Sequence, residues 1–196
     1  MQTLTRLYDT HTDAVDVVNK LEADGVPHDS ISIVSNNAEG LPVDGDAAAE
    51  GAGTGASIGT VLGGGAGLLA GIGALAIPGV GPIVAAGWLV AALTGAGVGA
   101  AAGGLLGSLT GAGVDEADAH VHVEGVRRGG TLVTVRADDA QVAHVQSVLD
   151  ARTPVDIAAR RTEYQGDGWT AHNTSATPYT SEQVLAERAR RAASVQ

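Results

Sequence analysis

The sequence has no cysteine and no phenylalanine, and aromatic residues make up only 3% of its 196 residues. The absence of cysteine excludes disulfides, thiolate catalysis and cysteine-ligated zinc or iron–sulfur centres. Because aromatic side chains supply much of the bulk of an ordinary core, this core has to be built from small aliphatic side chains. Lys20 is the only lysine, and the formal net charge is −11. This charge balance argues against binding to a phosphate backbone, so we expect no nucleic-acid partner.

Catalytic and cofactor-binding motifs are missing as well. The sequence contains no GxSxG motif and no GxxxxGK[ST] loop. Residues 71–76 fit GxGxxA, but they do not follow a strand of a βαβ unit, so we interpret the match as accidental. The first ten residues contain no basic stretch followed by an apolar run, which argues against a signal peptide. We therefore expect a non-enzymatic, mostly cytoplasmic protein with no cofactor and no known small-molecule ligand.

One set of side chains has the spacing of a metal site. Glu116, His120 and Glu124 recur at every fourth residue, so a helix would place them on one face. A solvated charged face has the same pattern and is our interpretation, so no metal ligand is predicted.

Glycine is concentrated in the middle of the chain. Of 29 glycines, 21 lie between Gly51 and Gly113, and residues 51–114 contain no Asp, Glu, Lys, Arg or His. Two prolines with two glycines between them, in residues 77–82, should end one helix and begin another. This pattern predicts a Gly/Ala-rich antiparallel helical hairpin over residues 51–113. Its arms are expected at about 52–76 and 83–111, with the turn at 77–82.

In each predicted arm the glycines recur at steps of four residues, which places them on one helix face. Such a face lets another backbone approach closely, as in the small-xxx-small packing of membrane helices. The residues predicted to mediate helix packing and self-association are Gly51, Gly55, Gly59, Gly63, Gly67, Gly71, Gly87, Gly95, Gly99, Gly103, Gly107 and Gly111. The residues predicted to form the hairpin turn are Pro78, Gly79, Gly81 and Pro82.

These arms need a partner surface, because each glycine in a water-exposed helix costs about 1 kcal/mol relative to alanine. A lipid bilayer is one candidate, since both arms are long enough to span its hydrocarbon core. The core of a soluble homo-oligomer is the other. A disordered Gly/Ala linker is disfavoured by the strict spacing. Trp88, near the turn, suits either an interfacial anchor or a core position.

Both flanks of the glycine-rich segment look like ordinary α/β sequence. Residues 3–8 and 30–34 alternate like strands, and Val15, Val18 and Leu21 recur at helical spacing between them. Residues 131–136, 142–149 and 155–157 repeat the same strand–helix–strand order. We predict an α+β fold in which residues 1–40 and 114–163 supply two βαβ halves of one four-stranded, ferredoxin-like sheet. Two unrelated βαβ units are the alternative.

Two further segments complete the prediction. Residues 114–130 begin with acids and end with bases, which favours a linking helix, although His120–Val123 alternates like a strand. Residues 164–196 form a polar tail with a short helix from Ser181 to about Ala193. An ordered tail of this composition has to be held by the body or by a neighbouring copy.

Three segments together resemble the bacterial general stress proteins of the YflT-like, heat-induced type. These are residues 31–34 (ISIV), 74–82 (ALAIPGVGP) and 124–135 (EGVRRGGTLVTV). The resemblance covers about residues 1–163 and leaves out the tail. It implies a stress context and association with membranes, and it brings no catalytic residue or cofactor.

The expected function is therefore that of a stress-associated structural protein. It would self-assemble as a homo-oligomer, or insert into a membrane, through its glycine-zipper hairpin. The alternative is a soluble small-ligand sensor or regulatory domain that uses the βαβ repeat, an argument from fold analogy alone.

Overall fold

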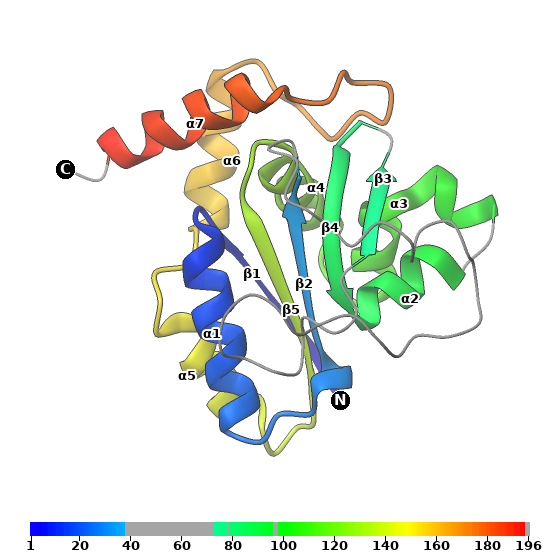
Figure 1. The fold of residues 1–196 in the computed structure, drawn as a ribbon, viewed down its shortest axis with the longest axis vertical. Coiled ribbons are helices and arrows are strands. Elements are labelled where there is room, and N and C mark those ends of the chain that lie inside the picture. Colours follow the sequence, from blue (N-terminus) through cyan, green and yellow to red (C-terminus); the bar gives the residue numbers. More distant parts are fainter. Residues whose placement is uncertain (38–72, 78, 96–97, 195–196) are drawn as a thin grey trace.

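A computed structural model of the chain describes residues 1–37, 73–77, 79–95 and 98–194 (Figure 1). Its mixture of helices and antiparallel strands confirms the α+β class. In chain order the elements are β1 (Gln2–Tyr8), α1 (His11–Ala23), η1 (His28–Ser30), β2 (Ile31–Asn36), β3 (Gly73–Ile77), β4 (Gly81–Gly87), α2 (Trp88–Gly95), α3 (Val98–Gly111), α4 (Glu116–Arg127), β5 (Thr131–Ala137), α5 (Val142–Asp150), α6 (Ile157–Gly166) and α7 (Ser181–Ser194).

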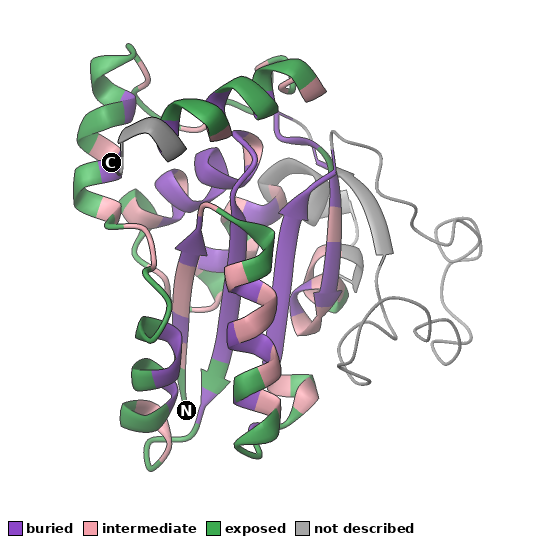
Figure 2. Cartoon of the chain, turned by 60° about the vertical axis from the view of Figure 1, so that its left-hand side comes forward, coloured by how far each residue is buried: buried purple, intermediate pink, exposed green. Residues whose placement is uncertain are grey.

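The sheet has five strands in the order β1-β5-β2-β4-β3, and every neighbouring pair is antiparallel. Strands β1 and β2 are therefore parallel to each other, with β5 between them. Helix α1 makes the crossover, which is the split βαβ arrangement. Helices α1 and α5 cover one face of the sheet, and α2, α3 and α4 cover the other (Figure 1). Figure 2 shows the strands largely buried between helices whose outer faces are exposed.

The first predicted βαβ half is confirmed. The side chain of Thr10 caps α1 by accepting a hydrogen bond from the backbone N–H of Asp13. Val18 and Leu21 are buried against the sheet, and Gly25, at a φ of 86°, follows the helix end.

The second predicted half is confirmed only for its first two elements. Strand β5 and helix α5 form as expected, but the predicted strand at 155–157 is wrong. The Asp156 carboxylate accepts a hydrogen bond from the backbone N–H of Ala159 and starts α6 at Ile157. Val155 still lies beside β1, where its N–H donates to the Leu7 carbonyl at 2.8 Å. One residue therefore occupies the place that a fourth ferredoxin-like strand would take.

The described part of the glycine-rich segment corrects the helical hairpin. The chain does reverse at 77–82, but between strands β3 and β4 rather than between helices. The reason is the free edge of β2, which β4 pairs along its length, with Ile83 and Ala85 buried on the sheet face. The second arm is also shorter than predicted, because α2 ends at Gly95 and Gly104 departs from helical geometry inside α3. The first arm, at 52–72, lies outside the described residues.

Within the described ranges, no helix is both long enough and apolar enough to cross a membrane. The linking helix at 114–130 is confirmed as α4, with Asp115 as its N-cap. The C-terminal helix is confirmed as α7.

Candidate functional site

The predicted packing glycines fall into three groups in the structure. Gly51, Gly55, Gly59, Gly63, Gly67 and Gly71 lie outside the described residues. Gly95 ends α2, while Gly99, Gly103, Gly107 and Gly111 lie in α3. Gly87 is not in a helix at all, which corrects its predicted role. It ends β4 with a φ of 89°, and a Cβ there would collide with the backbone of Ile31.

Gly107 and Gly111 form an open face on α3, which we call the α3 glycine face. A Cβ added at either position would meet nothing within 4 Å. Leu105 and Leu109, on the other side of the helix, are buried in the core. Gly107 and Gly111 thus face away from the body, and the two leucines hold the helix to it. Another helix could approach this face closely, because no side chain of the described residues stands in the way.

The predicted turn is covered by the C-terminal segment. Gly79 and Gly81 have positive φ values of 77° and 102°. A Cβ on Gly79 would collide with the backbone of Asn173, and one on Gly81 would come within 2.7 Å of the Pro178 ring. Figure 1 shows this segment passing the start of β4 before α7 begins. Pro82 is exposed, and Pro78 lies outside the described residues. The body therefore holds the tail, as an ordered tail requires.

Arginines and carboxylates gather at the end of the sheet where β1 stops, in a network that we call the arginine clamp. Its members are Asp9, Glu124, Arg127, Arg128, Arg160, Glu163, Asp167, Glu187, Arg190 and Arg191. They come from the end of β1 and from α4, α6 and α7. Tyr164 lies at the centre, fully buried, with the Arg128 guanidinium 4.2 Å from its ring centroid.

The deepest part of the clamp is the pair Glu124–Arg128. Glu124 is 2% exposed and Arg128 5% exposed, although both are charged residue types. The Arg128 Nε donates to Glu124 at 2.7 Å, and another of its nitrogens donates to Asp167 at 2.9 Å. Burial works against the charged guanidinium, but these hydrogen bonds raise the pKa of Arg128 above its ordinary value. Arg127 donates to Glu124 and to the Thr177 carbonyl, so α4 also holds the tail.

The outer part of the clamp is organised by Asp9. Its carboxylate accepts two hydrogen bonds from Arg160, at 2.9 and 2.7 Å, and one from Arg191 at 2.9 Å. Burial alone would raise the pKa of Asp9, but the hydrogen bonds and charges of the two arginines outweigh it and lower the pKa. Arg191 also donates to Glu187 at 2.8 Å. Because these guanidiniums already have carboxylate partners, the clamp acts as a structural lock rather than as an anion site.

The clamp was not foreseen from the sequence, where Arg127–Arg128 and Arg160–Arg161 look like charges at the ends of elements. The two adjacent arginine pairs are the only feature of the sequence that points to the clamp. The interpretation of the Glu116–His120–Glu124 pattern also changes. Glu124 belongs to the clamp, so Glu116, His120 and Glu124 are not one solvated face, while the His120 Nδ1 accepts from the His172 backbone at 3.1 Å. No group of side chains in the described part of the chain is arranged to hold a metal ion.

A serine and a histidine meet near the clamp. The Ser35 hydroxyl lies 3.4 Å from the His11 Nδ1 and 3.2 Å from the Thr131 hydroxyl. Burial lowers the pKa of His11, and the charge of Arg188 adds to the effect. A catalytic Ser–His pair also needs a group that orients the imidazole and donors for an oxyanion. None of the contacts found for His11 in the described ranges supplies the first.

These observations define the class: an α+β protein with a clamped C-terminal helix and an outward glycine face. A comparison with protein-family models, with curated proteins and with solved structures finds no match.

Proposed function

We propose that the chain is a non-enzymatic, self-assembling structural protein whose glycine-rich segment joins copies of the α+β body. The observation that carries the proposal is the α3 glycine face, where Gly107 and Gly111 point into open space. The stress context comes from the resemblance of the sequence to general stress proteins.

The energetic argument concerns glycines on an exposed helix. Each costs about 1 kcal/mol relative to alanine when the helix is solvated. Gly107 and Gly111 are not needed for the fold of the single chain, because a side chain at either position has room. Close contact with a second helix gives these positions a reason to be glycine, since backbones can then approach more closely than bulky side chains allow.

The clamp supports the same function. It fixes α4, α6 and α7 to the end of β1, on a body whose opposite sheet edge is β3. A rigid body is what an assembly subunit requires, since flexible units lose more conformational entropy when they associate.

The test is the double variant Gly107→Leu plus Gly111→Leu, measured by size-exclusion chromatography with light scattering. We expect the parent to form a homo-oligomer. The dissociation constant of the variant's oligomer should be at least about tenfold higher, because two leucines keep the helices apart. Gly166→Leu is the matched control, because it also lies in open space, at the end of α6. A variant that sizes like the parent, or a parent that is monomeric throughout, contradicts the proposal.

Flotation with phosphatidylcholine vesicles separates the two forms of the proposal. Parent protein that floats, and a double variant that does not, place the packing face in a bilayer. Parent protein that stays at the bottom as an oligomer places it in a soluble assembly.

A further inference from the structure

A row of hydroxyl side chains crosses the sheet face that α2, α3 and α4 cover. Thr5 of β1 pairs with Thr134 of β5, and Thr134 pairs with Ser32 of β2. The row ends at Gly87 of β4, which pairs with Ser32 and contributes no side chain to it. The neighbouring row on the same face is apolar and belongs to the core. We call Thr5, Thr134 and Ser32 the hydroxyl row.

Two of these hydroxyls have no hydrogen-bond partner in the described part of the chain. The Oγ1 atoms of Thr5 and Thr134 are buried and unpaired, although the two residues face each other across the strands. Ser32 donates to the Ala86 carbonyl at 2.7 Å, which leaves its oxygen free to accept. Buried polar atoms nearly always find a partner, from the protein, from water or from a ligand. The two unpaired oxygens are therefore available to a polar partner.

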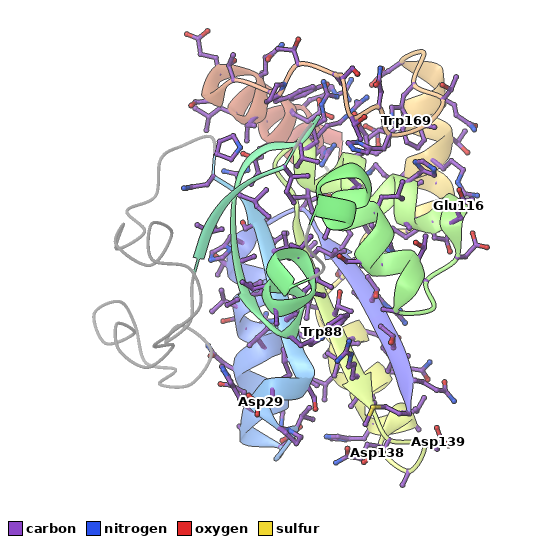
Figure 3. The ribbon with its side chains drawn as sticks, turned by 90° about the vertical axis from the view of Figure 1, so that its right-hand side faces the viewer. Asp29, Trp88, Glu116, Asp138, Asp139 and Trp169 are labelled. Carbon is purple, nitrogen blue, oxygen red and sulfur yellow. The ribbon has the colours of Figure 1, made fainter. Side chains whose placement is uncertain are left out.

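Two helices on the same side of the sheet contribute further unpaired atoms. The Nδ1 of His122, on α4, and the Nε1 of Trp88, on α2, are buried without a partner, and His122 is only 4% exposed. Figure 3 shows Trp88 below α2 on this side of the sheet. Burial, with the charge of Arg6 adding to it, lowers the pKa of His122 to about 4. The imidazole is therefore neutral at neutral pH and offers one N–H and one lone pair.

Two cations lie near this group, and one of them, Arg6, already pairs with Asp150 at 2.8 Å. Arg136 follows Thr134 on the same face of β5, is exposed, and lies 3.6 Å from the Trp88 ring centroid. Helices α2 and α3 contain no charged residue. On α4, Glu116 is exposed, while Asp118 pairs with Arg161 and Glu124 with the clamp. In a chain of net charge −11, this part of the sheet is thus rich in donors, and among the described residues it is free of competing carboxylates.

We propose that the hydroxyl row, with His122, Trp88 and Arg136, binds a small monocarboxylate. Two hydroxyls and an indole N–H can donate to carboxylate oxygens, and a guanidinium matches a carboxylate with two parallel hydrogen bonds. Because Asp150 neutralises Arg6, Arg136 is the cation left to balance a single negative charge. A phosphate dianion would bring a second charge that nothing here neutralises, and burying it would be costly. Ligand binding at this row requires no self-assembly.

The test uses the fluorescence of Trp88. The chain has two tryptophans, and Trp169 lies in the C-terminal region against Tyr164 (Figure 3), so Trp169→Phe leaves Trp88 as the only indole. This full-length protein is titrated with sodium acetate and sodium lactate, and with inorganic phosphate and sodium chloride at matched ionic strength. We expect a saturable change in Trp88 emission with a carboxylate and none with phosphate or chloride.

Variants on one strand make the result specific. Thr134→Val keeps the shape of the side chain and removes the unpaired hydroxyl, so carboxylate affinity should fall about tenfold or more. Thr131→Val is the matched control, because its hydroxyl belongs to the Ser35 contact, and it should bind like the parent. Arg136→Gln changes an exposed side chain and should weaken binding whether or not Thr134→Val folds well.

Three results would overturn the proposal. The first is the absence of a saturable response to either carboxylate. The second is an equal response to chloride or phosphate, which would indicate an effect of salt alone. The third is an unchanged carboxylate affinity in both Thr134→Val and Arg136→Gln. Any of the three results would mean that the hydroxyl row binds no carboxylate.

Discussion

The buried positive charges of this protein are carried by arginine side chains. All basic residues except Lys20 are arginines, and Arg128, Arg160 and Arg191 are buried in the clamp. A planar guanidinium donates up to five hydrogen bonds in fixed directions, so one side chain can satisfy carboxylates from several elements at once. A lysine ammonium carries its charge at a single point and has fewer donors. The choice of residue type therefore follows from the number of partners that each buried cation has to reach.

Replacement of Glu124 by alanine tests this at the residue scale. The change leaves Arg127 and Arg128 without their shared carboxylate in a buried setting. We expect the free energy of unfolding to fall by about 3–5 kcal/mol, as is usual when one partner of a buried ion pair is removed. Urea denaturation followed by circular dichroism measures the change.

Asp16→Ala is the control for that experiment. Asp16 pairs with Arg152 at 2.8 Å, but both side chains are well exposed, and such pairs contribute less than about 1 kcal/mol. If Glu124→Ala and Asp16→Ala lower the free energy of unfolding equally, burial of the clamp does not contribute to stability.

At the scale of elements, local signals succeed where a cap and a regular period coincide. Helices α1 and α4 begin directly after Thr10 and Asp115, each of which caps its helix with its side chain. Asp156 is a cap of the same kind, but the apolar alternation of residues 155–157 favours a strand at the same place. A cap followed by Ala158 and Ala159 favours helix, since alanine has the highest helix propensity. The error at α6 is therefore one of weighing two local signals that compete.

The clamp predicts that the docking of α7 depends on pH. The folded-state pKa of Asp9 lies below the unfolded value of about 4. The carboxylate therefore stabilises the folded chain above that pH, and the contribution is lost as the pH falls through the folded-state pKa. Hydrogen exchange between pH 7 and pH 3 should show α7 amides losing protection before those of β5.

Asp9→Asn should remove most of this pH dependence and weaken the protection of α7 already at pH 7. Asp29→Asn removes the same charge from an exposed position away from the clamp, so it should leave α7 unchanged. If α7 and β5 lose protection together in the parent, Asp9 does not control the docking of the helix.

On the scale of the whole molecule, two cores share one sheet. One lies under α1 and α5, and the other under α2, α3 and α4. Strand β5 contributes Val133 to the first core and Leu132 to the second. Because the side chains of β5 alternate between the two faces, loss of packing in either core destabilises the same strand. The body should therefore unfold as one cooperative unit, despite its lack of phenylalanine.

Two leucines, one in each core, test this cooperativity. Leu149 of α5 and Leu109 of α3 are both fully buried. Replacement of either by alanine should lower the free energy of unfolding by about 2–5 kcal/mol and leave a single transition. Tryptophan fluorescence and circular dichroism should give coincident urea curves for both variants. Separate transitions, with each variant shifting only one of them, would show two independent units instead.

The sequence by itself determined the features that local physics controls. It established the α+β class, the elements β1, α1, β2, β5 and α5, and the linking and C-terminal helices, because caps and periods act within a few residues. It also located the chain reversal at 77–82. The outward glycine spacing on α3 follows from sequence, although its role in assembly remains a proposal.

The tertiary structure alone decided the rest. An uncharged run of Gly, Ala, Val and Leu has no period that separates strand from helix, so the pairing of β4 with the open edge of β2 settled residues 81–87. The clamp joins Asp9 to Arg191, and the hydroxyl row joins Thr5 to Thr134, across most of the chain. Such partners are chosen by folding in three dimensions, and nothing in the neighbouring sequence encodes them.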